Sequence, residues 1–139
     1  MSNDRVDALV RRASCACGQL TIDCTGDPVR LSVCHCLDCQ RRSGSAFAVQ
    51  ARFPADRVRV SGPSKQWTRI ADSGGRSVNN FCPECGSTLF YSSRPHRDLV
   101  AVPVGAFADP NFPSPGFSVY ERRQHGWVAI VGDGIEHHE

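Results

Sequence analysis

The segment CHCLDCQ, residues 34–40, places three cysteines within six consecutive positions: Cys34, Cys36 and Cys39. The spacing Cys-x-Cys-x-x-Cys allows one short segment to wrap around a single metal ion. Structural zinc sites are usually tetrahedral, so three thiolates leave one position for another ligand. That ligand can be another residue of the chain, a water molecule or a substrate, and each possibility predicts a different kind of protein.

Five further cysteines bring the total to eight in a chain of 139 residues. The first residues, MSNDRVDALVRR, mix acidic and basic side chains and lack the apolar stretch of a secretory signal. We therefore expect a cytoplasmic protein, in which reduced thiols favour metal binding over disulfide bonds. No apolar run is long enough to cross a bilayer, so we expect no membrane partner.

Composition is that of an ordinary globular chain, with 40% hydrophobic and 22% charged residues. The length predicts one domain, residues 12–139, after a mobile leader at residues 1–11. A formal net charge of +2 provides no basic stripe for phosphate contacts, so we expect no nucleic-acid partner.

Short segments of the chain read as strands, with little helical periodicity between them. A short helical turn ended by Gly44 is expected at residues 37–45, and a hairpin tip at 72–76. The pattern predicts a mainly β fold built from small antiparallel sheets. The expected strands are residues 19–24, 29–33, 46–53, 57–60, 65–70, 98–107, 117–123 and 126–131, the last two closing the fold. Residues 117–123 could instead be helical.

A second cysteine motif, FCPECGS at residues 81–87, has the form of a metal-binding knuckle. Its tight turn directs backbone N–H groups at the sulfurs of Cys82 and Cys85. Gly86 allows the positive φ that often follows such a turn. One knuckle supplies two ligands, so a closed structural site needs two more.

The segment SCACGQ at residues 14–19 offers the missing pair, Cys15 and Cys17, again followed by glycine. On an extended chain these two side chains point to the same side. Joined to Cys82 and Cys85, they form a closed four-thiolate shell, a usual arrangement for structural zinc. The alternative is a set of buried thiols, or a redox pair within the knuckle.

The fourth ligand of Cys34, Cys36 and Cys39 remains open at this point. Cys24 competes for it, but its alternation with core-forming neighbours favours a buried thiol that acts as a small hydrophobe. His35 lies between two ligands and would point away from the metal. An open position, as in catalytic zinc sites, would suit a thiol substrate because the three-thiolate shell is soft and electron-rich.

The motifs CACG, CHCLDCQRRSGSAF, FCPECGSTLF and VPVGAFADP occur in this order, before a late Trp127. In this arrangement the sequence resembles the glutathione-dependent formaldehyde-activating enzyme (GFA) family, also called the CENP-V-type domain, over roughly residues 13–134. The resemblance implies a β-tent architecture with two zinc ions per chain. It implies structural zinc on Cys15, Cys17, Cys82 and Cys85, and a second zinc with an open position on Cys34, Cys36 and Cys39. The second zinc is expected to be lost more easily, because three short-range ligands chelate less than a closed four-thiolate shell.

Two functions follow from these expectations. The resemblance implies a carbon–sulfur lyase of the S-(hydroxymethyl)glutathione synthase type, in which a glutathione-like low-molecular-weight thiol adds to a small aldehyde such as formaldehyde, or the reverse elimination occurs. The alternative is a non-catalytic, zinc-stabilised binding module. Ligation by Cys24 would favour the module, whereas a dissociable fourth ligand would favour the enzyme.

Other polar and aromatic residues have two interpretations each. Arg41 and Arg42 follow the cluster and could meet substrate carboxylates, or form a solvated basic turn. Trp127 is expected in the core rather than as a stacking platform. His137 and His138 are interpreted as residues of the C-terminal tail.

Overall fold

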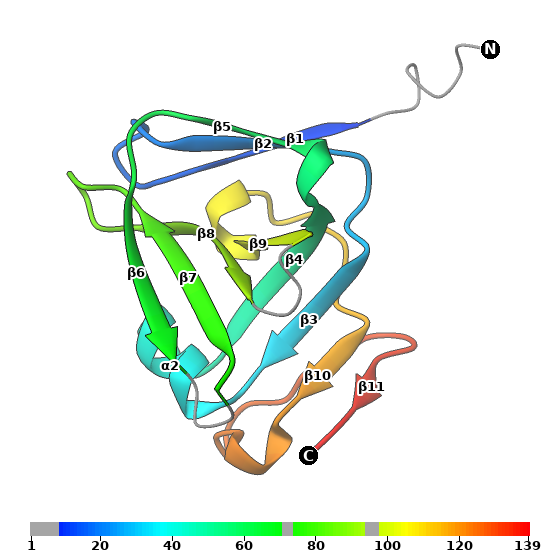
Figure 1. The fold of residues 1–139 in the computed structure, drawn as a ribbon. Helices are drawn as coiled ribbons and strands as arrows, with labels where there is room; N and C mark the ends of the chain where they lie inside the picture. The colour runs from blue at the N-terminus through cyan, green and yellow to red at the C-terminus, as the bar shows by residue number, and fades with distance from the viewer. Residues whose placement is uncertain (1–8, 71–73, 94–97) are drawn as a thin grey trace.

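A computed structural model describes residues 9–70, 74–93 and 98–139 of the chain (Figure 1). Its strands are β1 (Val10–Ser14), β2 (Thr21–Thr25), β3 (Arg30–Cys34), β4 (Ala48–Pro54), β5 (Val58–Ser61), β6 (Lys65–Ile70), β7 (Arg76–Phe81), β8 (Thr88–Ser93), β9 (Leu99–Pro103), β10 (Phe117–Val119) and β11 (Glu136–His137). Its helices are α2 (Leu37–Ser43) and the short 3-10 helices η1 (Ala55–Arg57), η2 (Val104–Phe107) and η3 (Glu121–Arg123). The expected mainly β fold is confirmed.

The strands form two sheets. The smaller sheet has the order β1-β2-β5, and the larger has the order β11-β10-β3-β4-β9-β8-β7-β6. The pairings are antiparallel except at β10, which runs parallel to both β3 and β11. The C-terminal part of the chain is thereby added along β3, with Val119 opposite Cys34.

The hydrophobic core lies where the two sheets meet. Leu20 and Ile22 from the small sheet side are fully buried against Phe53, Leu89 and residues of the large sheet. Figure 1 shows the small sheet lying across one end of the large one. The alternation of apolar and polar residues in β2 was predicted to place one face of the strand on the core. The structure confirms this, because Ile22 and Cys24 are buried and their neighbours are not.

The short helix was predicted correctly. Helix α2 covers Leu37–Ser43 and ends at Gly44, whose φ of 71° is the left-handed conformation that glycine adopts without strain. The hairpin of β6 and β7 is also present, with Ile70 opposite Arg76. Part of its expected tip, residues 71–73, lies outside the described residues.

The expectation for the N-terminal leader is wrong at its end. Strand β1 begins at Val10, so Val10 and Arg11 belong to a sheet, while residues 1–8 lie outside the described part. Antiparallel pairing with β2 explains the difference, since Val10 lies opposite Thr25 and Arg11 opposite Cys24, and two ion pairs accompany it. Arg12 Nε lies 2.7 Å from Asp23 Oδ1 on the neighbouring strand, and Arg11 Nη1 lies 3.3 Å from Asp27 Oδ1. Val10 and Arg11, which were expected to be part of a mobile leader, are thus held in place by β2 and by Asp27 beyond it.

The expected closing strand at residues 126–131 is also wrong. This segment is a loop, and the position beside β10 is taken by β11 instead. Trp127 is 77% exposed and therefore lies outside the core. His137, interpreted as a tail residue, is part of β11, and its Nδ1 is 2.6 Å from Glu121 Oε2. The described helices include none that is long and apolar enough to cross a membrane.

Candidate metal centres

Four cysteines from two distant turns come together at the boundary of the sheets. Cys15 and Cys17 lie between β1 and β2, and Cys82 and Cys85 lie between β7 and β8. Their four sulfurs lie within 4.8 Å of one another. Tetrahedral zinc with Zn–S bonds of about 2.3 Å requires sulfurs about 3.8 Å apart. The separations of 3.7 Å for Cys15–Cys17 and 3.6 Å for Cys17–Cys82 match this requirement. We call this group the four-cysteine cluster.

Each of the two turns is closed by a glycine N–H that donates back to the carbonyl of the first cysteine, three residues earlier in one turn and four in the other. Gly18 N–H donates to the Cys15 carbonyl at 3.1 Å, and Gly86 N–H donates to the Cys82 carbonyl at 2.9 Å. Both glycines have positive φ, 86° and 80°. Leu20 N–H points at the Cys15 sulfur over 3.2 Å. The knuckle predicted at residues 81–87 is therefore present, whereas the segment with Cys15 and Cys17 forms a turn instead of the expected extended chain.

Ser87 fastens the two turns together, and sequence reasoning missed it. Its hydroxyl accepts a hydrogen bond from Ala16 N–H at 3.1 Å and lies 3.3 Å from the Cys85 sulfur. Hydrogen bonding with Ser87 lowers the pKa of Cys85 to about 5, which favours the thiolate that a metal ion requires. The cluster thus connects the small sheet to the large one through residues distant in sequence.

Three cysteines from one segment form a second group, the three-cysteine cluster. Cys34 ends β3, Cys36 is the N-cap of α2, and Cys39 lies in its first turn. Their sulfurs also lie within 4.8 Å of one another. The Cys36 sulfur accepts a hydrogen bond from the Cys39 backbone N–H at 3.3 Å, so the start of the helix orients one ligand toward another.

The close approach of these thiols makes their ionisation strongly unequal. Hydrogen bonds from Cys34 and then Cys39 lower the pKa of Cys36 to about 2, whereas the contact with Cys36 raises the pKa of Cys34. Three adjacent thiols cannot all ionise without an opposite charge nearby. A divalent cation supplies that charge, and a soft sulfur donor set with this spacing fits zinc. Both clusters can therefore hold metal ions.

His35 points away from the three-cysteine cluster, as predicted. Its ring is fully buried and its Nε2 lies 2.9 Å from Ser118 Oγ in β10. Burial lowers the pKa of His35, so the ring is held neutral. His35 thus ties the segment between two cysteines to the neighbouring strand.

Cys24 is a core residue. It is fully buried in the hydrophobic cluster between the sheets, and burial raises its pKa to about 12. Neither cysteine cluster includes it. Within the described residues, the three-cysteine cluster has no fourth Cys, His, Asp or Glu ligand.

We predict that Cys24→Ala keeps the full metal content of the protein and costs only the packing of a small buried side chain, about 1–2 kcal/mol. Zinc analysis of the purified variant and urea unfolding at equilibrium measure the two effects. Loss of one zinc ion per chain from this variant would show that Cys24 is a metal ligand, contrary to its absence from both cysteine clusters.

A buried polar network begins at α2, next to the three-cysteine cluster. Arg42 donates to Tyr91 Oη at 3.2 Å and lies over its ring at 4.3 Å. Tyr91 donates to Gln50 Oε1 at 3.1 Å, and Gln50 Nε2 donates to Ser32 Oγ at 3.2 Å. Burial raises the pKa of Tyr91 to about 12, so it stays a neutral donor. Arg42 is thus engaged within the protein, whereas Arg41 is exposed.

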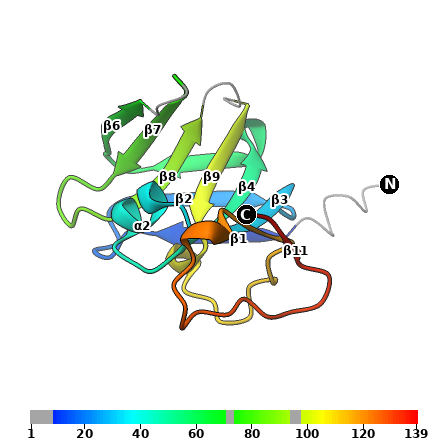
Figure 2. The ribbon, with the colours of Figure 1, turned by 90° about the horizontal axis from the view of Figure 1, so that it is seen from below.

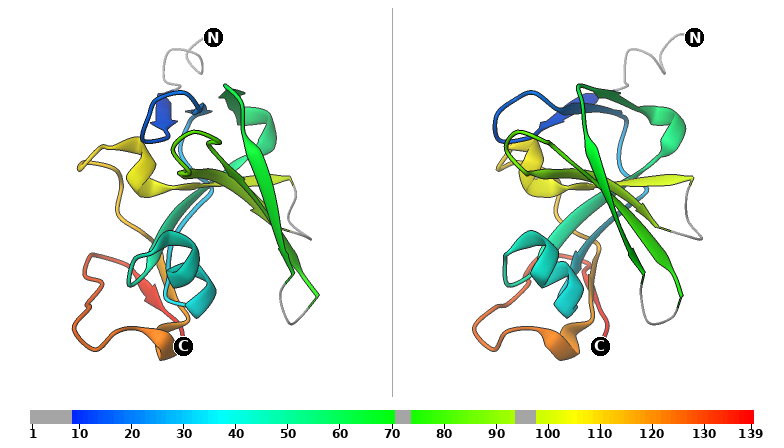
Figure 3. Two further views of the ribbon diagram at one scale, coloured as in Figure 1. Left: turned by 90° about the vertical axis from the view of Figure 1, so that its left-hand side faces the viewer. Right: turned by 60° about the vertical axis from the view of Figure 1, so that its left-hand side comes forward.

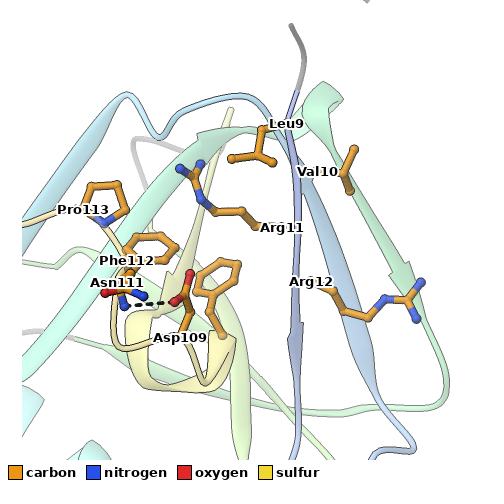
Figure 4. A pocket seen from close by; sticks show the side chains of 9 residues that line it. Leu9, Val10, Arg11, Arg12, Asp109, Asn111, Phe112 and Pro113 are labelled. Carbon is orange, nitrogen blue, oxygen red and sulfur yellow. Dashed lines mark hydrogen bonds between the residues drawn. The ribbon is translucent and has the colours of Figure 1, made fainter. Parts of the chain in front are cut away.

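A pocket lies away from these sulfurs, between β1 and the loop after η2 (Figure 4). Arg11 and Phe112 face each other across it, with the guanidinium 5.2 Å from the ring centroid. Asp109 Oδ1 accepts from Asn111 N–H at 2.9 Å on its rim. Cysteine is absent from its lining, so it is not part of either metal centre.

Comparison with known proteins agrees with this arrangement. The sequence profile of the glutathione-dependent formaldehyde-activating enzyme (GFA) family matches residues 10–123. The chain belongs to this family. The matched range contains all seven cysteines of the two clusters and ends at η3, so the GFA match does not include the segment from Gln124 to β11.

A solved structure has a similar fold. A crystal structure of a Rhodobacter sphaeroides protein, determined as a structural-genomics target, is similar with a TM-score of 0.53 and 19% sequence identity. The match covers 73% of this chain and 90% of that chain. At this identity the likeness shows a shared fold alone. No curated protein sequence matches this chain.

Proposed function

We propose that the three-cysteine cluster holds a zinc ion with an open coordination position, and that this position takes a low-molecular-weight thiol for addition to a small aldehyde. The observation that carries the proposal is the absence of a fourth Cys, His, Asp or Glu ligand from the described residues, while three thiols lie within 4.8 Å. The GFA match supports glutathione as the thiol and formaldehyde as the aldehyde.

When bound, zinc supplies a coordinated thiol as its thiolate at neutral pH. The reaction then needs no redox step. A sulfur–carbon bond forms between the thiolate and the aldehyde carbon, the carbonyl π bond breaks, and its oxygen takes up the proton released by the thiol. The product is a hemithioacetal, which for formaldehyde is the S-hydroxymethyl derivative of the thiol. The reverse reaction is the elimination. This is the chemistry of a carbon–sulfur lyase.

The roles of the chain's own residues follow from their positions. Cys34, buried at the end of β3, and Cys36 and Cys39, half-buried at α2, hold the metal. The four-cysteine cluster is proposed as a structural zinc site, because its four ligands close the shell. We also propose a cytoplasmic location, which agrees with eight free cysteines in a reducing compartment.

Zinc X-ray absorption tests this proposal directly. We expect an average of about 3.5 sulfur ligands per zinc in the resting protein, from one four-thiolate and one three-thiolate site, rising to about 4 with glutathione. S-methylglutathione, which keeps the carboxylates but has no thiol, should leave the average unchanged.

The same experiment separates the enzyme from its alternative. If the wild-type protein holds two zinc ions and glutathione never changes the sulfur count, the thiol-activating role fails. A zinc-stabilised binding module would then describe the protein better. Cys36→Ser lacks one ligand of the three-cysteine cluster. If glutathione raises its sulfur count per zinc as much as in the wild type, glutathione does not bind at this cluster.

A further inference from the structure

The amide side chain of Gln40, the residue after Cys39, bonds both to the segment before α2 and to the C-terminal segment around η3. Its Nε2 donates to the His35 carbonyl at 2.8 Å and to the Arg123 carbonyl at 3.2 Å. Its Oε1 lies 2.9 Å from His125 Nε2 and accepts a hydrogen bond from it. Both amide N–H donors are therefore committed, and the oxygen has a partner as well.

The first of these bonds closes the loop that carries the three-cysteine cluster. The His35 carbonyl lies between Cys34 and Cys36, and Gln40 reaches it from the far end of the segment. The Gln40 backbone N–H also donates to the Cys36 carbonyl at 3.0 Å. Because one segment supplies all three sulfurs, their separations depend on the shape of this loop. Gln40 fixes that shape from two directions.

The other two bonds fasten the loop to the C-terminal segment. Arg123 ends η3 and His125 follows it, and Figures 2 and 3 show this segment running beside α2. The His125 ring in turn lies 5.3 Å from the ring of the exposed Trp127. His125 and Trp127 lie beyond the range of the family match, so this contact is not part of what the match covers.

We propose that Gln40 is a positioning residue for the metal site at the three-cysteine cluster, and that it links this site to the C-terminal segment through Arg123 and His125. This inference rests on the proposed function, because it assumes a metal ion at that cluster. A neutral amide suits the role, since it donates to two carbonyls without adding negative charge beside three thiolates.

The test compares zinc affinity in matched variants. Gln40→Leu keeps a side chain of similar size but removes all three bonds. We expect it to bind the second zinc about 10- to 100-fold more weakly in competition with a chromophoric chelator, and to keep the first zinc. Gln124→Leu is the control, because the Gln124 side chain donates to the Val128 carbonyl at 2.7 Å within the same segment and, among the described residues, makes no hydrogen bond to α2.

A spectroscopic reading separates positioning from general destabilisation. With cobalt in place of zinc, thiolate charge-transfer and d–d bands report the geometry of the sulfur shell. Gln40→Leu should alter these bands at the three-cysteine cluster, whereas Gln124→Leu should not. His125→Phe, which removes only the contact at Oε1, should cause a smaller loss of affinity than Gln40→Leu.

Wild-type affinity and an unchanged cobalt spectrum in Gln40→Leu would overturn the positioning role while the proposed function stands. If Gln40→Leu fails to fold, Gln40→Glu takes its place, since it keeps the acceptor and loses the donors, and wild-type affinity in that variant overturns the role equally. A wild-type protein that binds one metal ion, with Cys36→Ser binding the same amount, would overturn both the metal site and the role of Gln40.

Discussion

Cys82→Ser should yield a protein that is unfolded or insoluble at ordinary temperatures. The Cys82 sulfur is fully buried, and its cluster joins turns of both sheets across 65 positions of sequence. The apparent binding free energy of structural zinc is about 10–16 kcal/mol and contributes directly to folding. This exceeds or equals the net stability of a typical domain, about 5–15 kcal/mol. We therefore expect the fold to be lost once the remaining ligands no longer hold this zinc tightly enough to join the two turns.

Thermal unfolding by circular dichroism and zinc analysis measure this effect. Cys24→Ser is the matched control, because Cys24 is the same residue type and is also fully buried but belongs to neither cysteine cluster. The control should stay folded with both zinc ions. A Cys82→Ser protein with the melting temperature and zinc content of the wild type would contradict a structural role for the four-cysteine cluster.

Local sequence spacing made both clusters predictable. The glycines after Cys17 and Cys85 mark turns that need positive φ, and both turns have it. The two turns could be paired because each supplies only half of a tetrahedral shell. The position of Cys24 followed from its alternation with Leu20 and Ile22, which describes one face of one strand.

Features that depend on distant partners were not predictable from such patterns. Gln40 meets residues 83 and 85 positions later, through hydrogen bonds that leave no periodic signal. The segment containing Trp127 has strand-like residues, yet the edge it would occupy is taken by β11. The sheet position of a strand depends on which edge is still free, and neither composition nor alternation encodes that.

Cys36→Ser should remove the second zinc ion and the thiol-dependent activity, and leave the fold intact. The three-cysteine cluster comes from one segment and joins no two sheets, so the core does not depend on its metal. The loop also keeps its protein contacts, through His35 to Ser118 and through Gln40 to Arg123. We therefore expect one zinc ion per chain and a melting temperature within a few degrees of the wild type.

One part of the expected loss of activity comes from the ionisation of the thiol. A free thiol with a pKa of about 8.5 is only about 3% thiolate at pH 7, whereas a metal-bound thiol is fully ionised. Removing the metal should lower the thiolate fraction of the bound thiol about 30-fold, and poorer alignment of thiol and aldehyde lowers the catalysed rate further. NMR exchange measurements with ¹³C-formaldehyde and glutathione separate this rate from the uncatalysed addition.

Cys24→Ser again provides the control, since it makes the same chemical change in a buried cysteine outside the cluster and should retain the activity. An unfolded Cys36→Ser protein would show that the fold depends on the second metal after all. If neither the wild-type protein nor Cys36→Ser raises the rate above that of the uncatalysed reaction, the protein does not catalyse the addition of glutathione to formaldehyde. Full activity in Cys36→Ser, with one zinc ion bound, would instead separate the chemistry from the three-cysteine cluster, because a serine hydroxyl cannot replace a thiolate in a soft sulfur shell.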